Sequence, residues 1–231
     1  LIISAGFAET GDDGRARQDA MLAKVRAAGM RMVGPNCLGL LNADPAISLD
    51  ATFAPTWPPH GNVAFSSQSG AVGLAILDHA KQLGIGIHQF VSIGNKADVS
   101  GNDLIEHWGA DPAVQVVLLY LESFGNPTRF MRICKQVART KPIVAVKSGR
   151  TTAGARAASS HTGALAGLEV AVDALISQAG VIRTDTIEEL FDVAMVAANQ
   201  PVPRGNRVAL LTNAGGPGIM ATDACESHGL V

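Results

Sequence analysis

Short runs of apolar, β-branched residues alternate with longer segments of helical periodicity along most of the sequence, and this alternation is what most constrains the fold. The clearest cycle begins with the run NVAFSS at residues 62–67 and continues with a helix-length segment at residues 71–84. Strands that alternate with helices of ten or more residues are typical of a parallel sheet covered by helices. The sequence therefore predicts an α/β fold.

The same cycle repeats through residues 61–200. Strands are predicted at residues 62–67, 87–93, 114–122, 142–148 and 181–184, and a helix-length segment follows each of them. Five strands joined by helices fit a flavodoxin-like sheet. We therefore expect residues 61–200 to form a flavodoxin-like domain.

The residues before this domain follow a shorter α/β pattern. An apolar strand is predicted at residues 1–4, a helix at residues 13–29 and a second strand at residues 30–36. These elements fit the later half of a Rossmann-like, parallel-sheet domain over residues 1–55. The proline-rich run FAPTWPPHG, at residues 53–61, is typical of a linker.

The residues from 205 onward follow the α/β pattern again. A strand at residues 207–211, a glycine turn and a helix predict the start of another α/β domain over residues 205–231. Both ends of the sequence interrupt such a unit, so we expect the sequence to be a piece of a longer protein.

Composition excludes several classes of function. Hydrophobic residues make up 47% of the chain, enough for an ordinary core, and the formal net charge of -2 provides no basic field for a nucleic acid. Cys37, Cys134 and Cys225 are odd in number and far apart, which argues against a disulfide framework or a metal site. No apolar run approaches the roughly 20 residues that span a bilayer. We expect a cytoplasmic protein that binds small molecules, with no metal site, nucleic-acid partner or membrane contact of its own.

The run SSQSGAVG passes from a predicted strand into a predicted helix. Its hydroxyls, its glycines and the positive end of the helix could hold an anion, which makes Ser67, Gln68, Ser69 and Gly70 candidate phosphate-binding residues. A serine N-cap followed by a glycine for close packing accounts for the same residues without any ligand. The run alone leaves both interpretations open.

Two titratable residues follow other strands of the same sheet edge. Glu122 ends the apolar run VVLLYLE, where a carboxylate favours a cationic or hydrogen-bonding partner, although a solvated strand end is an equal alternative. His161 follows the long polar stretch at residues 148–160, and loops of this length are uncommon unless they are functional. A histidine between such a loop and a helix can act as a nucleophile toward phosphorus.

The run GPNCLG follows the predicted strand at residues 30–36. Its glycine, proline and asparagine form a turn with exposed backbone groups that suits an extended polar ligand. Cys37 within it could be a nucleophile, but no base is evident beside it, and a small buried cysteine is the simpler interpretation.

Four motifs in order resemble the NDP-forming acyl-CoA synthetases, a family that includes ADP-forming acetyl-CoA synthetases and the α subunit of succinyl-CoA ligase. They are GPNCLG at residues 34–39, SSQSGAVG at 66–73, LYLES at 119–123 and SSHTGALAG at 159–167. The resemblance covers essentially the whole chain. It implies that the residues before the linker are the later half of a CoA-binding domain and that the next two segments are ligase domains.

The resemblance also implies roles for single residues. His161 matches the phosphohistidine and Glu122 the carboxylate that orients it. The helix start that holds the anion matches Ser67, Gln68, Ser69 and Gly70. Pro35, Asn36 and Cys37 match the CoA-side turn. The implied reaction interconverts acyl-CoA, ADP and phosphate with a carboxylic acid, ATP and CoA through an acyl phosphate and a phosphohistidine.

The implied partners follow from what the sequence lacks. Nothing in it resembles the ATP-grasp domain that binds ATP or ADP and Mg²⁺, so we expect an ATP-grasp domain or subunit elsewhere, and an oligomer. The alternative is an acyl-CoA-sensing regulatory module of a protein acetyltransferase fusion, but the presence of both His161 and Glu122 favours catalysis. A flavin-binding carrier is a further rival, and 4% aromatic residues offer few stacking partners for it.

Overall fold

A computed structural model describes residues 1–149, 169–201 and 203–231 of the protein. The chain divides into two compact units, Leu1–Ala198 and Asn199–Val231. The larger unit contains the sheet and the pocket described below.

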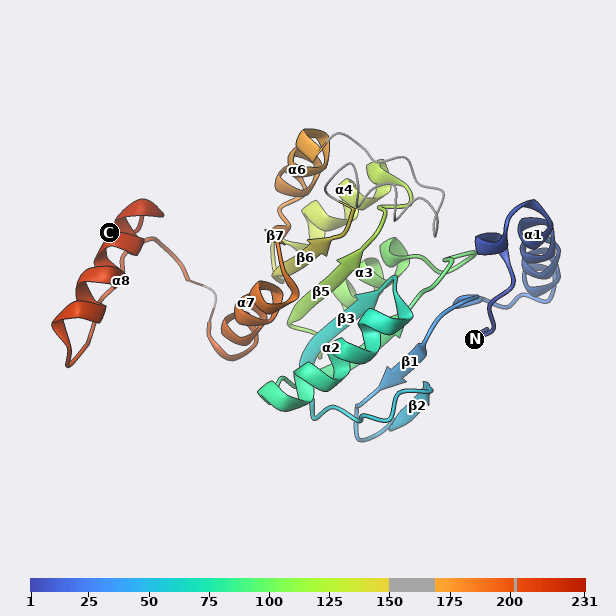
Figure 1. The fold of residues 1–231 in the computed structure, drawn as a ribbon, viewed down its shortest axis with the longest axis horizontal. Helices are drawn as coiled ribbons and strands as arrows, with labels where there is room; N and C mark the ends of the chain where they lie inside the picture. The colour runs from blue at the N-terminus through green and yellow to red at the C-terminus, as the bar shows by residue number, and fades with distance from the viewer. Residues whose placement is uncertain (150–168, 202) are drawn as a thin grey trace. The chain divides into compact units, whose positions relative to one another are not determined.

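The described residues form one sheet with strand order β2-β1-β4-β3-β5-β6-β7 (Figure 1). Strands β3 to β7 are parallel, and their order, β4-β3-β5-β6-β7, is that of flavodoxin-like sheets. The predicted flavodoxin-like fold is therefore confirmed. The strands are β1 (Gly39–Asn42), β2 (Leu49–Thr52), β3 (His60–Ser67), β4 (Ile87–Ser92), β5 (Val116–Leu121), β6 (Ile143–Lys147) and β7 (Ile182–Thr184).

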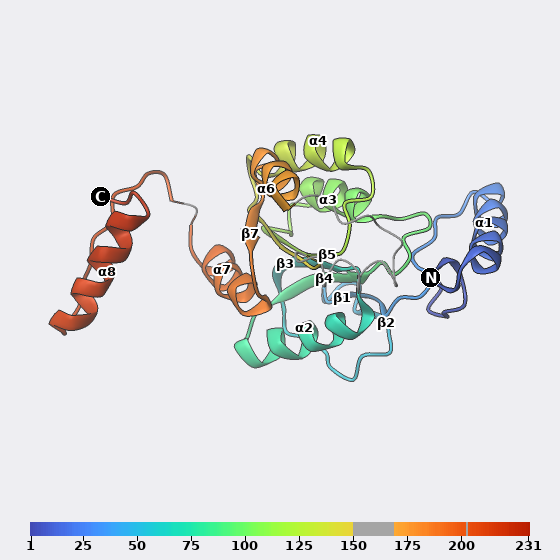
Figure 2. The ribbon, with the colours of Figure 1, turned by 45° about the horizontal axis from the view of Figure 1, so that its top comes forward.

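Helices cover both faces of this sheet (Figure 2). Helices α3, α4 and α6 bury Trp108, Phe130 and Ile176 on one face, and α2 and α7 bury Leu77 and Phe191 on the other. The helical elements are η1 (Ala8–Thr10), α1 (Asp12–Ala27), α2 (Gly70–Leu83), α3 (Gly101–Ala110), α4 (Pro127–Val137), α6 (Glu169–Gln178), α7 (Ile187–Asn199) and α8 (Gly215–Ser227). Each helix expected from the periodicity is present.

Local capping explains where the helices after β3, β4 and β5 begin. Ser69 caps α2 by accepting a hydrogen bond from the Val72 N–H, and Asn126 caps α4 with Pro127 at its first position. Ser100 and Asp103 form a capping box at the start of α3. These caps fix where the helices begin after the turns at the carboxyl ends of the strands.

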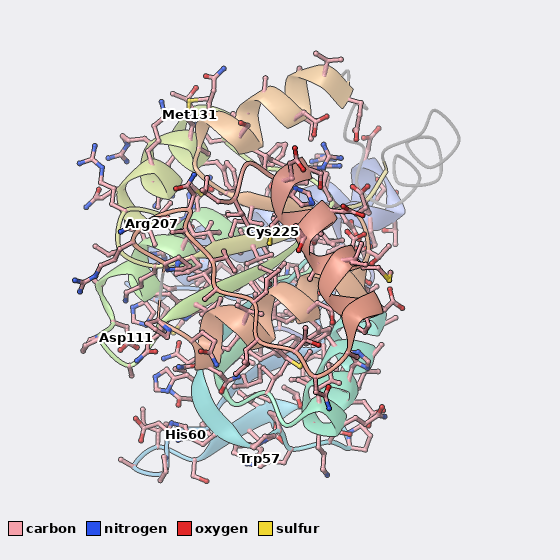
Figure 3. All side chains as sticks on the ribbon, turned by 90° about the vertical axis from the view of Figure 1, so that its left-hand side faces the viewer. Trp57, His60, Asp111, Met131, Arg207 and Cys225 are labelled. Atoms are coloured by element: carbon pink, nitrogen blue, oxygen red, sulfur yellow. The ribbon has the colours of Figure 1, made fainter. Side chains whose placement is uncertain are left out.

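Strands β1 and β2 were not predicted from the sequence. They form an antiparallel pair, and β1 also pairs antiparallel with β4, so residues 39–52 extend the sheet of the flavodoxin-like domain. The predicted linker at residues 53–61 therefore lies within one sheet: residues 53–59, which include Trp57, connect β2 to β3, and β3 begins at His60 (Figure 3). Four-residue strands give little periodic signal, and β4 lies far along the chain from β1.

The strands predicted at residues 1–4 and 30–36 are absent, and that prediction was wrong. Two backbone hydrogen bonds join these segments, Ile2 N–H to Val33 O and Asn36 N–H to Ser4 O. Residues 32–35 instead pair with the loop after β4. Their carbonyl oxygens accept three backbone hydrogen bonds, which the N–H groups of Asn95, Ala97 and Val99 donate. An extended segment becomes a strand only when it forms a ladder of hydrogen bonds with another strand. Here residues 32–35 bond to a loop instead.

The smaller unit consists of α8 and an extended segment. The predicted strand at residues 207–211 is also absent, because Val208 and Val231 share only a short pairing in which Val208 N–H donates to Val231 O and Val231 N–H to Asn206 O. The predicted helix after the glycine turn is present as α8. Among the described residues, no helix has both the length and the apolar character needed to cross a bilayer.

Candidate functional site

The carboxyl ends of β3, β4 and β5 meet at a pocket of about 790 Å³. Ligands of open parallel sheets bind at this edge, beside the point where the strand order reverses, and β3 is the strand at that point. The residues that line the pocket come from the turns after these strands, from α2 and from the N-terminal segment. They are Ile3, Ala8, Glu9, Gly11, Arg15, Gln18, Asn36, Cys37, Leu38, Phe53, Gln68, Ser69, Gly70, Ala71, Leu74, Gly94, Asn95, Lys96, Glu122 and Ser123.

The start of α2 forms one wall of the pocket. Three of the four predicted phosphate-binding residues, Gln68, Ser69 and Gly70, line it. Ser67 is fully buried beneath them, where its hydroxyl donates to Ser69 O at 2.6 Å and accepts from Ser69 N–H at 3.2 Å. Because the first N–H groups of a helix have no partner within the helix, this wall offers donors and a positive dipole end to an anion.

Gln68 is 7% exposed, and its side chain connects the end of β3 to the turn after β5. Its Oε1 accepts hydrogen bonds from the Glu122 and Ser123 N–H groups, each at 2.9 Å, and its Nε2 donates to Ser123 O at 2.7 Å. Three hydrogen bonds from one buried side chain fix the position of the Glu122 backbone relative to the start of α2.

Glu122 lines the pocket and is half-buried. Within the described ranges its carboxylate makes no hydrogen bond or ion pair, although its backbone N–H is held by Gln68. A carboxylate at the edge of a pocket with open acceptor capacity can take an N–H from an imidazole or from a ligand.

Lys96 is a pocket residue to which the sequence pattern assigned no role. It follows β4 with a φ of 48°, and its ammonium lies between Gln68 and Ser123. Burial lowers the pKa of Lys96 to about 8, with nearby Glu122 opposing and Lys147 reinforcing this shift. Its place directly after the strand in GNKADVS was visible in the sequence, but its partners lie on two other strand ends.

The predicted CoA-side turn lies against the same pocket. Asn36 and Cys37 line it, whereas Pro35 lies behind and accepts the Asn95 N–H through its carbonyl at 2.9 Å. The Cys37 thiol donates to Ile2 O at 3.3 Å, and burial raises the pKa of Cys37 above its ordinary value. A protonated, hydrogen-bonded thiol suits packing rather than nucleophilic attack.

Gly94 permits this turn to approach the loop after β4. It has a φ of 51°, and a Cβ at this position would lie 2.2 Å from the carbonyl oxygens of Pro35 and Asn36. We expect Gly94→Ala to lower the free energy of unfolding by roughly 1–3 kcal/mol, because it adds a clash to a left-handed backbone. Denaturant unfolding measures this. Gly101→Ala is the control, since its Cβ would meet only Ile93 at 3.9 Å, and an equal loss in both variants would contradict the assignment.

Polar residues of the N-terminal segment complete the opposite wall, and the sequence contained no signal for them. The Asn95 side-chain amide donates to Gln18 Oε1 at 3.0 Å and to the Glu9 carboxylate. Burial would raise the pKa of Glu9, but hydrogen bonds from Asn95 and from the Gly6 and Phe7 N–H groups outweigh it and lower this pKa. The wall therefore carries a stable carboxylate beside the CoA-side turn.

His161 lies outside the described residues, as does most of the polar stretch at residues 148–160. The described chain on either side of that gap is anchored. Ser148 N–H donates to Leu121 O at 2.9 Å, and α6 begins at Glu169, which pairs with Arg183. Among the described residues, no group of three His, Cys, Asp or Glu side chains could hold a metal ion.

Residues 60–197 match the family model of the succinyl-CoA ligase like flavodoxin domain, in agreement with the flavodoxin-like strand order. The chain belongs to this family. It is 44% identical over 99% of its length to the acetate–CoA ligase [ADP-forming] I subunit alpha of Pyrococcus furiosus, and 41% identical over 98% to the 4-hydroxybutyrate–CoA ligase [ADP-forming] of Nitrosopumilus maritimus.

A solved structure is similar throughout. The dinucleotide-forming acetyl-coenzyme A synthetase 1 of Ca. Korarchaeum cryptofilum, in complex with phosphate and ADP, superimposes with a TM-score of 0.92 at 39% identity and covers 99% of this chain. The predicted resemblance to ADP-forming acetyl-CoA synthetases is thus confirmed. The chain spans 33% to 49% of the length of these relatives.

Proposed function

We propose that the chain is part of an ADP-forming acid–CoA ligase that interconverts acyl-CoA, ADP and phosphate with a carboxylic acid, ATP and CoA. The pocket carries this proposal, because it combines an anion-accepting helix start, a carboxylate with open acceptor capacity and the turn assigned to CoA. The Pyrococcus furiosus and Nitrosopumilus maritimus relatives are both named as ADP-forming ligases, although for different acids. The acyl group of this protein is therefore left to experiment.

The first step forms an acyl phosphate. A phosphate held by the N–H groups at the start of α2, with Gln68, Ser69 and Gly70 around it, attacks the thioester carbonyl. The new C–O bond replaces the C–S bond, and CoA leaves as the thiolate and takes a proton. Asn36 and Cys37, which also line the pocket, border the CoA in this arrangement.

The second step moves the phosphoryl group to His161. One imidazole nitrogen attacks phosphorus, the acyl oxygen–phosphorus bond breaks, and the carboxylate is released. Glu122 accepts the N–H of the other imidazole nitrogen, which fixes the tautomer and stabilises the positive charge of the phosphorylated ring. Breaking the N–P bond then transfers the phosphoryl group to ADP.

The remaining parts of the ligase belong to the same proposal. ADP and Mg²⁺ would be bound by an ATP-grasp domain or subunit, and the name of the Pyrococcus relative, a subunit alpha, supports an oligomeric enzyme. A cytoplasmic location fits the three free cysteines of the chain. Magnesium, where bound, would neutralise phosphate charge, and we assign no residue of this chain to it.

The proposal is tested by assaying the full-length protein together with its nucleotide-binding part. Acetyl-CoA, ADP, phosphate and magnesium should yield ATP and free CoA in equal amounts, and omitting phosphate should stop the reaction. A screen of acyl-CoA substrates then identifies the preferred acid. No ATP from any acyl-CoA, by a folded protein that binds ADP, would reject the ligase assignment.

Ser69→Ala should weaken phosphate handling more than CoA binding. The substitution removes the cap of α2 at a cost of about 1 kcal/mol, and it loosens the N–H groups that face the pocket. We expect the KM for phosphate to rise several-fold while the KM for CoA changes little, measured from initial rates.

Asn126→Ala provides the matched control for Ser69→Ala. It removes the cap of α4, where Asn126 Oδ1 accepts the Arg129 N–H at 2.9 Å, and Asn126 does not line the pocket. It should lose similar stability with an unchanged KM for phosphate. Equal losses of phosphate and CoA binding in Ser69→Ala would mean that this serine only supports the fold.

A further inference from the structure

The loop after β4 is held in place by its backbone, and this fixes the direction of Lys96. Lys96 N–H donates to Ile93 O at 2.9 Å, and the N–H groups on either side, of Asn95 and Ala97, donate to Pro35 O and Gly34 O. The backbone of Lys96 is therefore anchored on both sides. Its long side chain crosses from the end of β4 toward the ends of β3 and β5.

The Lys96 ammonium joins the turns that follow these two strands. It donates to Gln68 Oε1 at 3.2 Å and to the Ser123 hydroxyl, and it lies 3.4 Å from Ser123 O. The same Gln68 oxygen accepts the backbone N–H groups of Glu122 and Ser123. Among the described residues this buried oxygen thus receives three donors, and of these three Lys96 carries the charge.

We propose that Lys96 is a positioning residue of the ligase site: its ammonium holds Gln68 against the turn that carries Glu122, and so keeps the Glu122 carboxylate at the pocket. The inference rests on the proposed function and adds a residue to it. Lys96 acts through Gln68 and Ser123, while Glu122 is the group that meets the imidazole.

Charge around Lys96 gives the proposal a pH dependence. Within the described part of the chain, the charged groups that face it are Glu122 after β5 and Lys147 at the end of β6, and Glu9 and Arg15 line the same pocket from the N-terminal segment. Burial lowers its pKa to about 8. Well below this pH, Lys96 is protonated and carries its full charge. As the pH rises through this value, the ammonium loses one proton and its charge, which weakens its hydrogen bond to Gln68.

The kinetic test uses the complete ligase with Lys96→Met, Lys96→Arg and the control Lys81→Met, which lies exposed at the end of α2. Lys96→Met should lower kcat roughly 10-fold or more with little change in KM, as expected when a charged hydrogen bond is lost. Lys96→Arg should retain a higher kcat than Lys96→Met. Its kcat should begin to fall at a higher pH than the kcat of the wild type. An unchanged kcat in Lys96→Met, or an identical alkaline decline in Lys96→Arg, would overturn the proposal.

Hydrogen exchange tests the positioning without using turnover. In Lys96→Met, the amides of Glu122 and Ser123 should exchange faster than in the wild type, while those within α2 stay unchanged. Lys81→Met should leave both sets unchanged. Wild-type protein without ligase turnover would reject the proposed function, whereas unchanged exchange at Glu122 and Ser123 in Lys96→Met would reject the role of Lys96.

Discussion

Replacing His161 with alanine in the complete ligase is expected to reduce ATP formation by roughly 10⁴-fold or more, because it removes the atom that accepts the phosphoryl group. Formation of the acyl phosphate precedes this step and should survive. The measurements are ATP release from acyl-CoA, ADP and phosphate, and hydroxylamine trapping of the acyl phosphate in the same mixture.

His107→Ala is the control for His161→Ala. His107 is exposed on α3 and does not line the pocket, so the same substitution there should leave the rate within about twofold of the wild type. Turnover near the wild-type rate in a homogeneous His161→Ala protein would show that another group receives the phosphoryl group.

Glu122→Gln has the second largest expected effect, a fall in kcat of about 100-fold or more. The substitution keeps the shape of the side chain and the backbone hydrogen bond to Gln68. It removes the negative charge that would hold the imidazole N–H and stabilise the phosphorylated ring. Single-turnover measurement of phosphoryl transfer isolates this step, and the KM for CoA should change little.

Glu188→Gln on α7 is the matched control for Glu122→Gln, since Glu188 is exposed and does not line the pocket. A Glu122→Gln enzyme with wild-type phosphorylation and dephosphorylation rates would remove Glu122 from the site. Equal slowing in both variants would indicate a general effect of charge.

The sequence predicts the flavodoxin-like sheet because each of its strands is encoded by a short apolar run that can be recognised locally. Runs such as NVAFSS and VVLLYLE are apolar and β-rich, and each is followed by a helix with its own cap. The motif order then predicts the family. Each strand, cap and motif is formed by residues close together in the chain.

The parts that sequence reasoning missed depend on distant partners. Strand β1 pairs with nearby β2, but its place in the sheet depends on the pairing of residues 40–42 with residues 89–91, while the apolar segments at residues 1–4 and 207–211 lack a ladder. The position of Lys96 likewise depends on Gln68 and Ser123, which lie on other strand ends. Local patterns cannot indicate such pairings.

The most direct test of the central claim is phosphorylation of His161 in the full-length protein with its nucleotide-binding part, using γ-labelled ATP and magnesium. We predict an acid-labile, base-stable label that maps to His161, is absent from His161→Ala, and is released by CoA plus a carboxylic acid. A folded, ATP-binding protein that takes up no label would contradict the ligase assignment and favour an acyl-CoA-sensing module.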